Sequence, residues 1–218
     1  MPAPYLGHTR PARPTLHHRV RSHRKRDPSV RLRLVEQALA GDRHQSGRLI
    51  DDVLTGAHVT LRPVRAGDEA KLRQIFTDPE VARWWGDPSK SVADAMEVLA
   101  GESRFVIEHD GNAIGFIQAS EETDPMYTHA SIDISLRSPW QGKGLGPDAI
   151  RTLARFLIHQ RGHHRLTIDP AAHNTRAIKA YERVGFKPVG LMRQYELGPS
   201  GEWHDGLLMD MLAGELRD

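Results

Sequence analysis

Residues 131–146, SIDISLRSPWQGKGLG, are the stretch of sequence that decides the fold. Its first half alternates, with Ile132, Ile134 and Leu136 separated by polar residues, which predicts a half-buried strand. Its second half places glycine at every second position and leads into a helix predicted over residues 147–160. Glycine lets the backbone approach a ligand closely, and the free N–H groups at a helix N-terminus attract anions. The stretch therefore predicts a strand, an anion-binding turn and a helix.

Two common phosphate-binding motifs do not fit this turn. A nucleotide P-loop needs Ser or Thr after Gly-Lys, but Lys143 is followed by Gly144. A dinucleotide fingerprint needs its third glycine one position beyond Gly146 and an acidic residue about twenty positions later. Gln141, Gly144 and Gly146 form the pattern Gln-x-x-Gly-x-Gly, which resembles the acetyl-CoA pyrophosphate loop of the GCN5-related N-acetyltransferases (GNAT superfamily). Taken alone, the motif is also compatible with a simple tight turn.

A second motif covers residues 174–186, NTRAIKAYERVGF. Its apolar residues have helical spacing and Gly185 is a typical residue after a helix C-terminus, so a core stripe explains part of it. The pattern also resembles the N-x-x-A-x-x-x-Y-x-x-x-G-F segment of the GNAT superfamily, in the right order after the glycine turn. The chain is identified as a member of that superfamily over residues 58–213. The resemblance implies an α/β (α+β) fold: a mixed, mostly antiparallel twisted sheet with helices on both faces and a splayed central strand pair.

The other predicted elements agree with such a sheet. They are strands at 58–64, 105–108, 114–119, 165–169, 186–197 and 203–212, helices at 66–76, 92–100 and 174–184, a turn at Asp78-Pro79, and a cap at Ser91.

Charge divides the chain into segments. Residues 1–33 hold nine Lys or Arg against one acid, although the chain as a whole carries a net charge of only +2. We predict a basic, disordered tail over residues 1–28, a helical N-terminal extension over residues 29–57 and the acetyltransferase domain over residues 58–218. A nucleic-acid-binding arm is the alternative interpretation of the tail.

Composition excludes several classes of protein. There is no cysteine, hence no disulfide framework and no thiol nucleophile. Neither a membrane-length apolar run nor a secretory signal is found, which predicts a cytoplasmic protein without a membrane partner. His159, His163, His164 and His173 lack a metal-ligand spacing, so no metal is expected.

The resemblance implies acetyl-CoA as the co-substrate. The cofactor-binding residues that it assigns are Leu136, Gln141, Gly142, Lys143, Gly144, Leu145, Gly146, Asn174, Ala177 and Tyr181. Backbone N–H groups of the glycine turn hold the pyrophosphate, that of Leu136 bonds the thioester carbonyl, and Asn174 bonds the pantetheine chain. Tyr181 protonates the leaving thiolate, and Asp133 is the second catalytic residue, suited to accept the proton of the amine directly or through water.

The acceptor amine is predicted from a second set of residues. Trp84-Trp85-Gly86, the acidic loop with Glu122 and Asp124, and the Asp169-Pro170 pair resemble the aminoglycoside 6′-N-acetyltransferases. The resemblance implies that Trp84, Trp85, Glu122, Asp124, Asp133 and Asp169 bind a small polycationic amine, which together with acetyl-CoA is the expected partner, in a monomer or homodimer.

Other interpretations remain open at this point. The two tryptophans can be core residues, the acidic loop can be solvated surface, and Asp169 can cap a turn. Trp203-His204-Asp205 resembles a turn of branches that acylate protein N-termini or diverse amines, so an acetyltransferase that acts on a protein N-terminal or other amine is one alternative. A non-catalytic acetyl-CoA sensor is the alternative of a different class.

Overall fold

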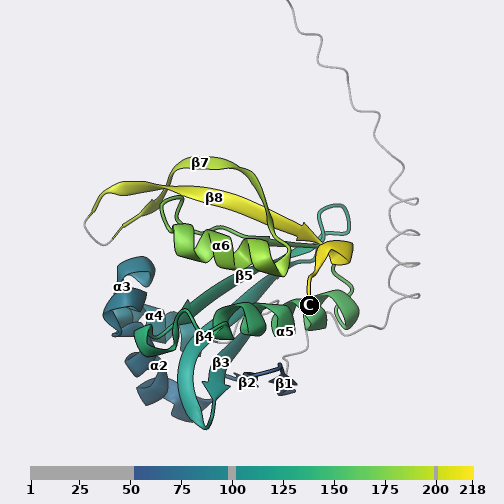
Figure 1. The fold of residues 1–218 in the computed structure, drawn as a ribbon. Coiled ribbons are helices and arrows are strands. Elements are labelled where there is room, and N and C mark those ends of the chain that lie inside the picture. Colours follow the sequence, from purple (N-terminus) through teal and green to yellow (C-terminus); the bar gives the residue numbers. More distant parts are fainter. Residues whose placement is uncertain (1–51, 98–101, 199–200) are drawn as a thin grey trace, which may run out of the picture. The chain divides into compact units, whose positions relative to one another are not determined.

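The computed structural model describes residues 52–97, 102–198 and 201–218. The predicted tail and most of the predicted extension lie outside the described residues. The strands are β1 (Leu54–Thr55), β2 (Thr60–Pro63), β3 (Glu102–His109), β4 (Asn112–Glu122), β5 (His129–Leu136), β6 (Arg165–Ile168), β7 (Lys187–Leu197) and β8 (Trp203–Leu212). The α-helices are α2 (Glu69–Phe76), α3 (Pro79–Trp85), α4 (Pro88–Met96), α5 (Leu145–His159) and α6 (Thr175–Val184) (Figure 1). Three short 3₁₀ turns are η1 (Ala66–Asp68), η2 (Ser138–Trp140) and η3 (Ala213–Glu215).

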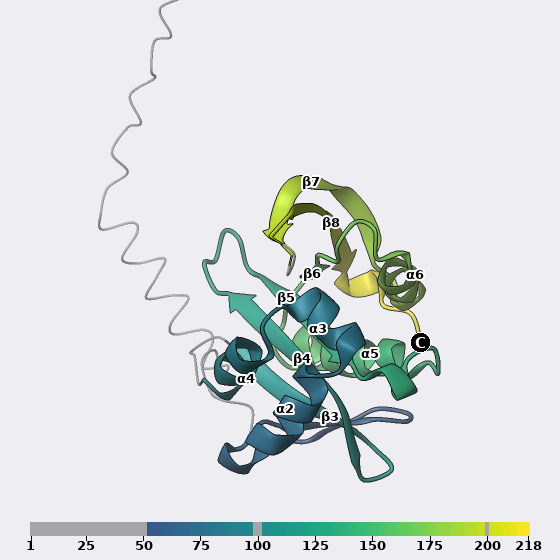
Figure 2. The ribbon, with the colours of Figure 1, turned by 90° about the vertical axis from the view of Figure 1, so that its left-hand side faces the viewer.

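The eight strands form one sheet in the order β1-β2-β3-β4-β5-β6-β8-β7. Every pair of neighbours is antiparallel except β5 and β6, which are parallel. The long β7–β8 hairpin reaches past the rest of the sheet at one end (Figures 1 and 2). The predicted mixed, mostly antiparallel sheet is confirmed.

Helices cover both faces of this sheet. Along β3, Phe105 and Ile107 belong to the core that contains α5, whereas Val106 between them belongs to the core formed by α2, α3 and α4. This is the alternation that a strand buried on both faces produces. The sheet is therefore a central layer between α5 and α6 on one side and α2 to α4 on the other.

Helix α3 stands where the sequence predicts only a turn. Asp78 is its N-cap, with a carboxylate that accepts the Glu80 N–H at 3.0 Å, and Pro79 occupies the first turn, where its missing N–H costs nothing. The same carboxylate accepts the Ser138 N–H at 3.0 Å. Asp78 thus starts α3 and attaches it to the end of β5.

Helix α4 shows the same signal and corrects a second prediction. It begins at Pro88, not at residue 92, because Asp87 accepts the N–H groups of Ser89 at 2.7 Å and Lys90 at 3.0 Å. Ser91, the predicted cap, lies inside the helix and donates to backbone carbonyls. An Asp-Pro pair is therefore the N-terminal signal of both helices.

The sheet starts earlier than residue 58, the predicted start of the domain. Residues 54–55 pair with β2, and Asp148 in the first turn of α5 accepts the N–H groups of Ala57, His58 and Val59 at 3.1, 2.7 and 3.0 Å. A buried carboxylate with three such donors is well satisfied. The last residues of the predicted helical extension therefore belong to the sheet.

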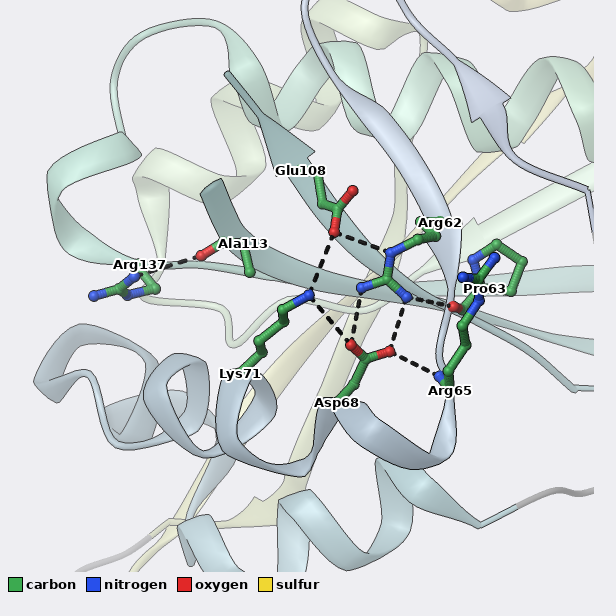
Figure 3. Close-up of polar contacts among 8 residues, drawn as sticks. All are labelled: Arg62, Pro63, Arg65, Asp68, Lys71, Glu108, Ala113 and Arg137. Carbon is green, nitrogen blue, oxygen red and sulfur yellow. Dashed lines mark hydrogen bonds and ion pairs between the residues drawn. The ribbon is translucent and has the colours of Figure 1, made fainter. Parts of the chain in front are cut away.

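An ionic network surrounds the buried carboxylate of Asp68, between β2, β3 and α2 (Figure 3). The guanidinium of Arg62 on β2 donates to both oxygens of Asp68, at 2.8 and 2.9 Å, and to Glu108 on β3 at 3.0 Å. The Arg65 N–H also donates to Asp68, at 2.8 Å. Lys71 of α2 lies 3.5 Å from Asp68. The network joins β2, β3 and α2.

Candidate active site

A gap opens between β5 and β6 because their pairing is short. The two strands are in register only at Ala130–Leu166 and Ser131–Thr167, whereas β5 continues to Leu136. Arg137 N–H donates to the Ile114 carbonyl at 2.9 Å, so Leu136 belongs to a non-hydrogen-bonded pair of the β4–β5 ladder. The backbone groups of such a residue point away from the partner strand. The Leu136 N–H therefore points into the gap.

The glycine turn lies at the end of this gap. Gly142 and Gly144 have φ angles of 75° and 82°, which a side chain with a Cβ rarely adopts, and Gly144 is the N-cap of α5. A Cβ on Gly146 would lie 3.1 Å from the Leu136 side chain, a tight contact. The first N–H groups of α5 have no partner within the helix. Backbone conformation and close packing thus explain the three glycines.

A cavity of about 410 Å³ joins the gap, the glycine turn and α6. Of the predicted cofactor-binding residues, the following line it: Leu136, Gln141, Gly142, Gly144, Gly146, Asn174, Ala177 and Tyr181. The two others lie beside it. Leu145 is 4 % exposed with its side chain in the core, and the Lys143 ammonium lies 5.2 Å from the centre of the Trp140 ring.

Two polar residues of this cavity also hold the backbone. Gln141 donates its amide N–H to the Leu136 carbonyl at 2.6 Å, which fixes the turn against the strand end. Asn174 caps α6, with its side-chain oxygen accepting the Ala177 N–H at 3.2 Å. The conformation of the site therefore depends on both side chains.

Tyr181 is buried in the wall of the cavity, with 9 % of its surface exposed. Burial raises the pKa of its phenol far above the ordinary value, and the carboxylates of Asp133 and Asp169 raise it further. The phenol is therefore fully protonated over the working pH range of a protein.

Asp133 lies on β5 and Asp169 directly follows β6, and the charge of Asp169 acts on Asp133. Asp133 is partly buried and accepts a hydrogen bond from the Gln118 amide at 3.0 Å. Burial raises the pKa of the Asp133 carboxyl, and the charge of Asp169 raises it further. The hydrogen bond from Gln118 lowers this pKa but does not outweigh the other two effects. A carboxylate of raised pKa is a better base near neutral pH.

Tyr195 is a site residue that the sequence pattern does not reveal. Its phenol interacts with the Asp169 carboxylate, and this interaction is the main cause that raises the pKa of Tyr195 to about 12. It stands in a bulge of β7, where Gln194 has a φ of 49° and donates its N–H to Asp205 at 2.8 Å. A bulge re-aims side chains, which simple alternation along a strand does not predict. Gly206 of β8 packs against the Tyr195 ring, where a Cβ would lie only 2.7 Å from it.

A second cavity, of about 420 Å³, lies on the other side of the tryptophan pair. Trp84 and Trp85 line both cavities, and the second is completed by Arg83, Gly86, His173, Glu196, Leu197, Gly198 and His204. The Trp84 ring lies 5.0 Å from that of His173, which lies 5.3 Å from that of His204. Burial raises the pKa of the Glu196 carboxyl, whereas the two histidines lower it. Aromatic rings with a half-buried acid can hold a ring-shaped polar ligand.

The two tryptophans line the cavities, and one of them also packs against core residues. Trp85 packs at 5.3 Å from Phe76 and 5.8 Å from Phe116, so the core interpretation holds for part of its surface. The Trp84 indole N–H is buried without a hydrogen-bond partner among the described residues.

Glu122 and Asp124 are not brought to either cavity. They lie at the β4–β5 turn, at the opposite end of the sheet from the β7–β8 turn (Figure 1). Glu122 accepts the Asp124 N–H and Asp124 accepts the Met126 N–H, both at 2.8 Å. Their carboxylates thus shape this exposed turn.

Residues 52–97, 102–198 and 201–218 contain neither a candidate metal site nor a helix that could span a membrane. No group of three or more His, Cys, Asp or Glu there could hold a metal ion. Over the same ranges, every helix is too short or too polar to cross a bilayer.

Comparisons with known proteins agree with the fold. Residues 58–187 match the family model of the acetyltransferase (GNAT) domain. The chain is 33% identical to the aminoglycoside N(6′)-acetyltransferase type 1 of Klebsiella pneumoniae over 153 residues, 61% of this chain and 75% of that protein. It is 25% identical to the spermidine N(1)-acetyltransferase of Escherichia coli K12 over 165 residues, 72% of this chain and 87% of that one.

A solved structure shows the same architecture. RimJ of Mycobacterium smegmatis, in complex with CoA-disulfide, superposes with a TM-score of 0.68 at 25% identity, covering 78% of this chain and 91% of its own. The family model spans more than half of the chain, and the splayed strands, glycine turn and buried tyrosine occur in the predicted order. The chain therefore belongs to the GNAT family and is an N-acetyltransferase.

Proposed function

We propose that this protein transfers the acetyl group of acetyl-CoA to a primary amine of a small polycationic acceptor, the 6′-amine of an aminoglycoside. The observation that carries the proposal is the gap between β5 and β6, whose cavity is lined by the glycine turn and by the buried Tyr181, while the charges of Asp133 and Asp169 act on that phenol. Similarity to an aminoglycoside N(6′)-acetyltransferase supports the choice of acceptor.

The donor side of the site fits acetyl-CoA, which GNAT acetyltransferases use. The turn at Gly142 and Gly144 offers backbone N–H groups and the N-terminus of α5 to a pyrophosphate. The inward N–H of Leu136 suits the thioester carbonyl, whose oxygen gains negative charge during attack. Asn174 and Ala177 on α6 line the opposite wall, where the pantetheine chain would pass.

The reaction needs one base and one acid. The nitrogen of the neutral amine attacks the thioester carbon, the C–S bond breaks, and the nitrogen gives up one proton. Asp133 takes this proton, directly or through water, because burial has raised its pKa. Tyr181 gives its phenolic proton to the thiolate, and solvent returns the proton from Asp133 to the phenolate.

The two groups are coupled through their charges. The negative charge of Asp133 is one cause of the raised pKa of Tyr181. When Asp133 takes up the amine proton, that charge disappears and the pKa of the phenol falls. Tyr181 therefore becomes a stronger acid at the stage where the thiolate forms.

The acceptor side of the site is acidic and aromatic. The charge of Asp169 acts on Glu196, and the phenol of Tyr195 interacts with Asp169. A sugar ring can stack on Trp84 in the second cavity while its ammonium groups face these carboxylates. A polycation would thus span from the thioester to the second cavity.

The test is the charge of Asp169. We expect Asp169→Asn to raise KM for an aminoglycoside by about tenfold or more, since a hydrogen bond to a charged group contributes about 1.5–3 kcal/mol. KM should also rise with salt, because screening weakens attraction over about 8–10 Å. Asp94→Asn, an exposed acid of α4, is the matched control and should change neither value.

A protein N-terminus is the competing acceptor, because the segment Trp203-His204-Asp205 resembles a turn of branches that acylate such amines. It carries fewer positive charges and predicts a shallower response to salt. Turnover of a peptide α-amine without turnover of any aminoglycoside, and with no response to Asp169→Asn, would exclude the proposed acceptor.

A further inference from the structure

Helix α6 carries a row of cations that the roles given so far do not use. Arg176, Lys179 and Arg183 stand at positions i, i+3 and i+7 of the helix, so they lie along one stripe. All three line the 410 Å³ cavity, as do Asn174 and Tyr181 of the same helix. The stripe therefore borders the same cavity as the glycine turn.

The charges along this border are unbalanced. Among the lining residues that the structure describes, Glu80 is the single acid, and its carboxylate lies 3.5 Å from the Arg176 guanidinium. Across the described ranges, Lys179 and Arg183 form no ion pair. The cavity thus has two uncompensated positive charges on one wall, which indicates an anionic ligand.

The chemistry of acetyl-CoA identifies the anion, if acetyl-CoA is the co-substrate as proposed above. Its phosphate groups are the pyrophosphate, which suits the glycine turn, and a 3′-phosphomonoester on the ribose. A phosphomonoester carries a charge of about −1.5 to −2 at pH 7 and has three strong acceptor oxygens. Arg binds such a group with two parallel hydrogen bonds, and Lys binds it as a point charge.

We propose that Lys179 and Arg183 bind the 3′-phosphate of CoA and make the enzyme select CoA over dephospho-CoA. The alternative is a solvated helix face that serves solubility alone. A 3′-phosphate site and a solvated face make different predictions about ligand selectivity. A solvated face does not distinguish ligands that differ only by this phosphate.

Calorimetric titration of the full chain with CoA and with 3′-dephospho-CoA tests the proposal without catalysis. We expect the wild-type protein to bind CoA about tenfold more tightly than dephospho-CoA. Lys179→Gln/Arg183→Gln should bring this ratio close to one by weakening CoA binding alone. The control Lys90→Gln/Arg193→Gln removes the same charge from exposed sites away from the cavity and should keep the wild-type ratio.

The outcomes separate this inference from the proposed function. Equal binding of the two ligands by the wild-type protein overturns the 3′-phosphate site and leaves acetyl-CoA as co-substrate. An unchanged ratio in the α6 double variant also overturns it. If the wild-type protein binds neither ligand, both the inference and the proposed co-substrate fail. Because both residues are exposed, the variant should unfold at the wild-type temperature, and a matching melting curve confirms that the comparison is valid.

Discussion

A tyrosine that serves as a general acid must keep its proton until the thiolate forms. Burial and two neighbouring carboxylates keep the phenol of Tyr181 protonated. We predict that Tyr181→Phe lowers kcat by about 10- to 1000-fold, within the range for lost proton transfer, while the Kd for CoA changes little. Steady-state kinetics and calorimetry check both. A wild-type kcat in the variant would assign the proton to water.

The raised pKa of Asp133 makes a prediction about pH. As the base of the reaction, Asp133 must be ionised, so kcat falls when the pH drops through its pKa. Burial places that pKa above the ordinary value of about 4. A profile of kcat against pH should therefore show an acid limb above pH ~4, which Asp133→Asn removes together with most of the activity. A wild-type kcat that is flat down to pH ~4 contradicts this role.

At the scale of elements, the β7 bulge positions the acceptor side. A Cβ on Gly206 of β8 would lie 2.7 Å from the Tyr195 ring. We predict that Gly206→Ala displaces this ring from Asp169 and raises the acceptor KM by about tenfold, with Tyr195→Phe acting in the same direction. Gly190→Ala is the control, because a Cβ there meets nothing within 4 Å. Equal KM values for the two glycine variants would remove Tyr195 from the acceptor site.

The sequence predicts well those features that depend on residues close together in the chain. The Gln141 to Gly146 turn and the Asn174 to Gly185 helix each carry their own signals: positive-φ glycines, an N-cap and a C-terminal glycine. The strands around them follow from alternation. Such signals depend on neighbours within a few residues, and they located the donor half of the candidate site.

What the sequence does not predict depends on distant contacts. Glu196 approaches His173 and Trp84 only because the β7–β8 hairpin folds back over α3 and the segment before α6. The Glu122 and Asp124 pair looks like a cation site in the sequence, yet the length of β5 carries it to the far end of the sheet. The helix that starts at Asp78-Pro79 was missed for a different reason, since an Asp-Pro pair is both a turn signal and a helix start.

At the scale of the whole molecule, the described domain separates its charges. The donor cavity is bordered by Arg176, Lys179 and Arg183, whereas the acceptor side holds Asp169 and Glu196. An anionic donor and a cationic acceptor are thus attracted to different sides of the same gap. This arrangement suits direct transfer in a ternary complex.

The stability of the domain should depend on the network around Asp68. Burial pushes the pKa of this carboxyl upward, but the hydrogen bonds from Arg62 and Arg65 outweigh it and hold the pKa below its ordinary value. A lowered folded-state pKa contributes stability above the unfolded value of about 4, and the contribution is lost as pH falls through the folded value.

We therefore predict that Asp68→Asn lowers the free energy of unfolding by about 2–3 kcal/mol at pH 7. The difference from wild type should shrink below pH ~4. Urea denaturation at pH 7 and pH 3 measures both, with Asp94→Asn as the control. A difference that is the same at the two pH values would show that charge is not its cause.

The identity of the amine that receives the acetyl group is tested most directly by one pair of substrates. Purified protein is incubated with acetyl-CoA and two aminoglycosides that differ only in bearing an amine or a hydroxyl at the 6′ position. We predict a product heavier by one acetyl group from the 6′-amine compound, with the new amide located at that nitrogen by NMR, and no product from the 6′-hydroxyl compound. Acetylation of both compounds, or of neither while a peptide N-terminus is acetylated, would contradict the account.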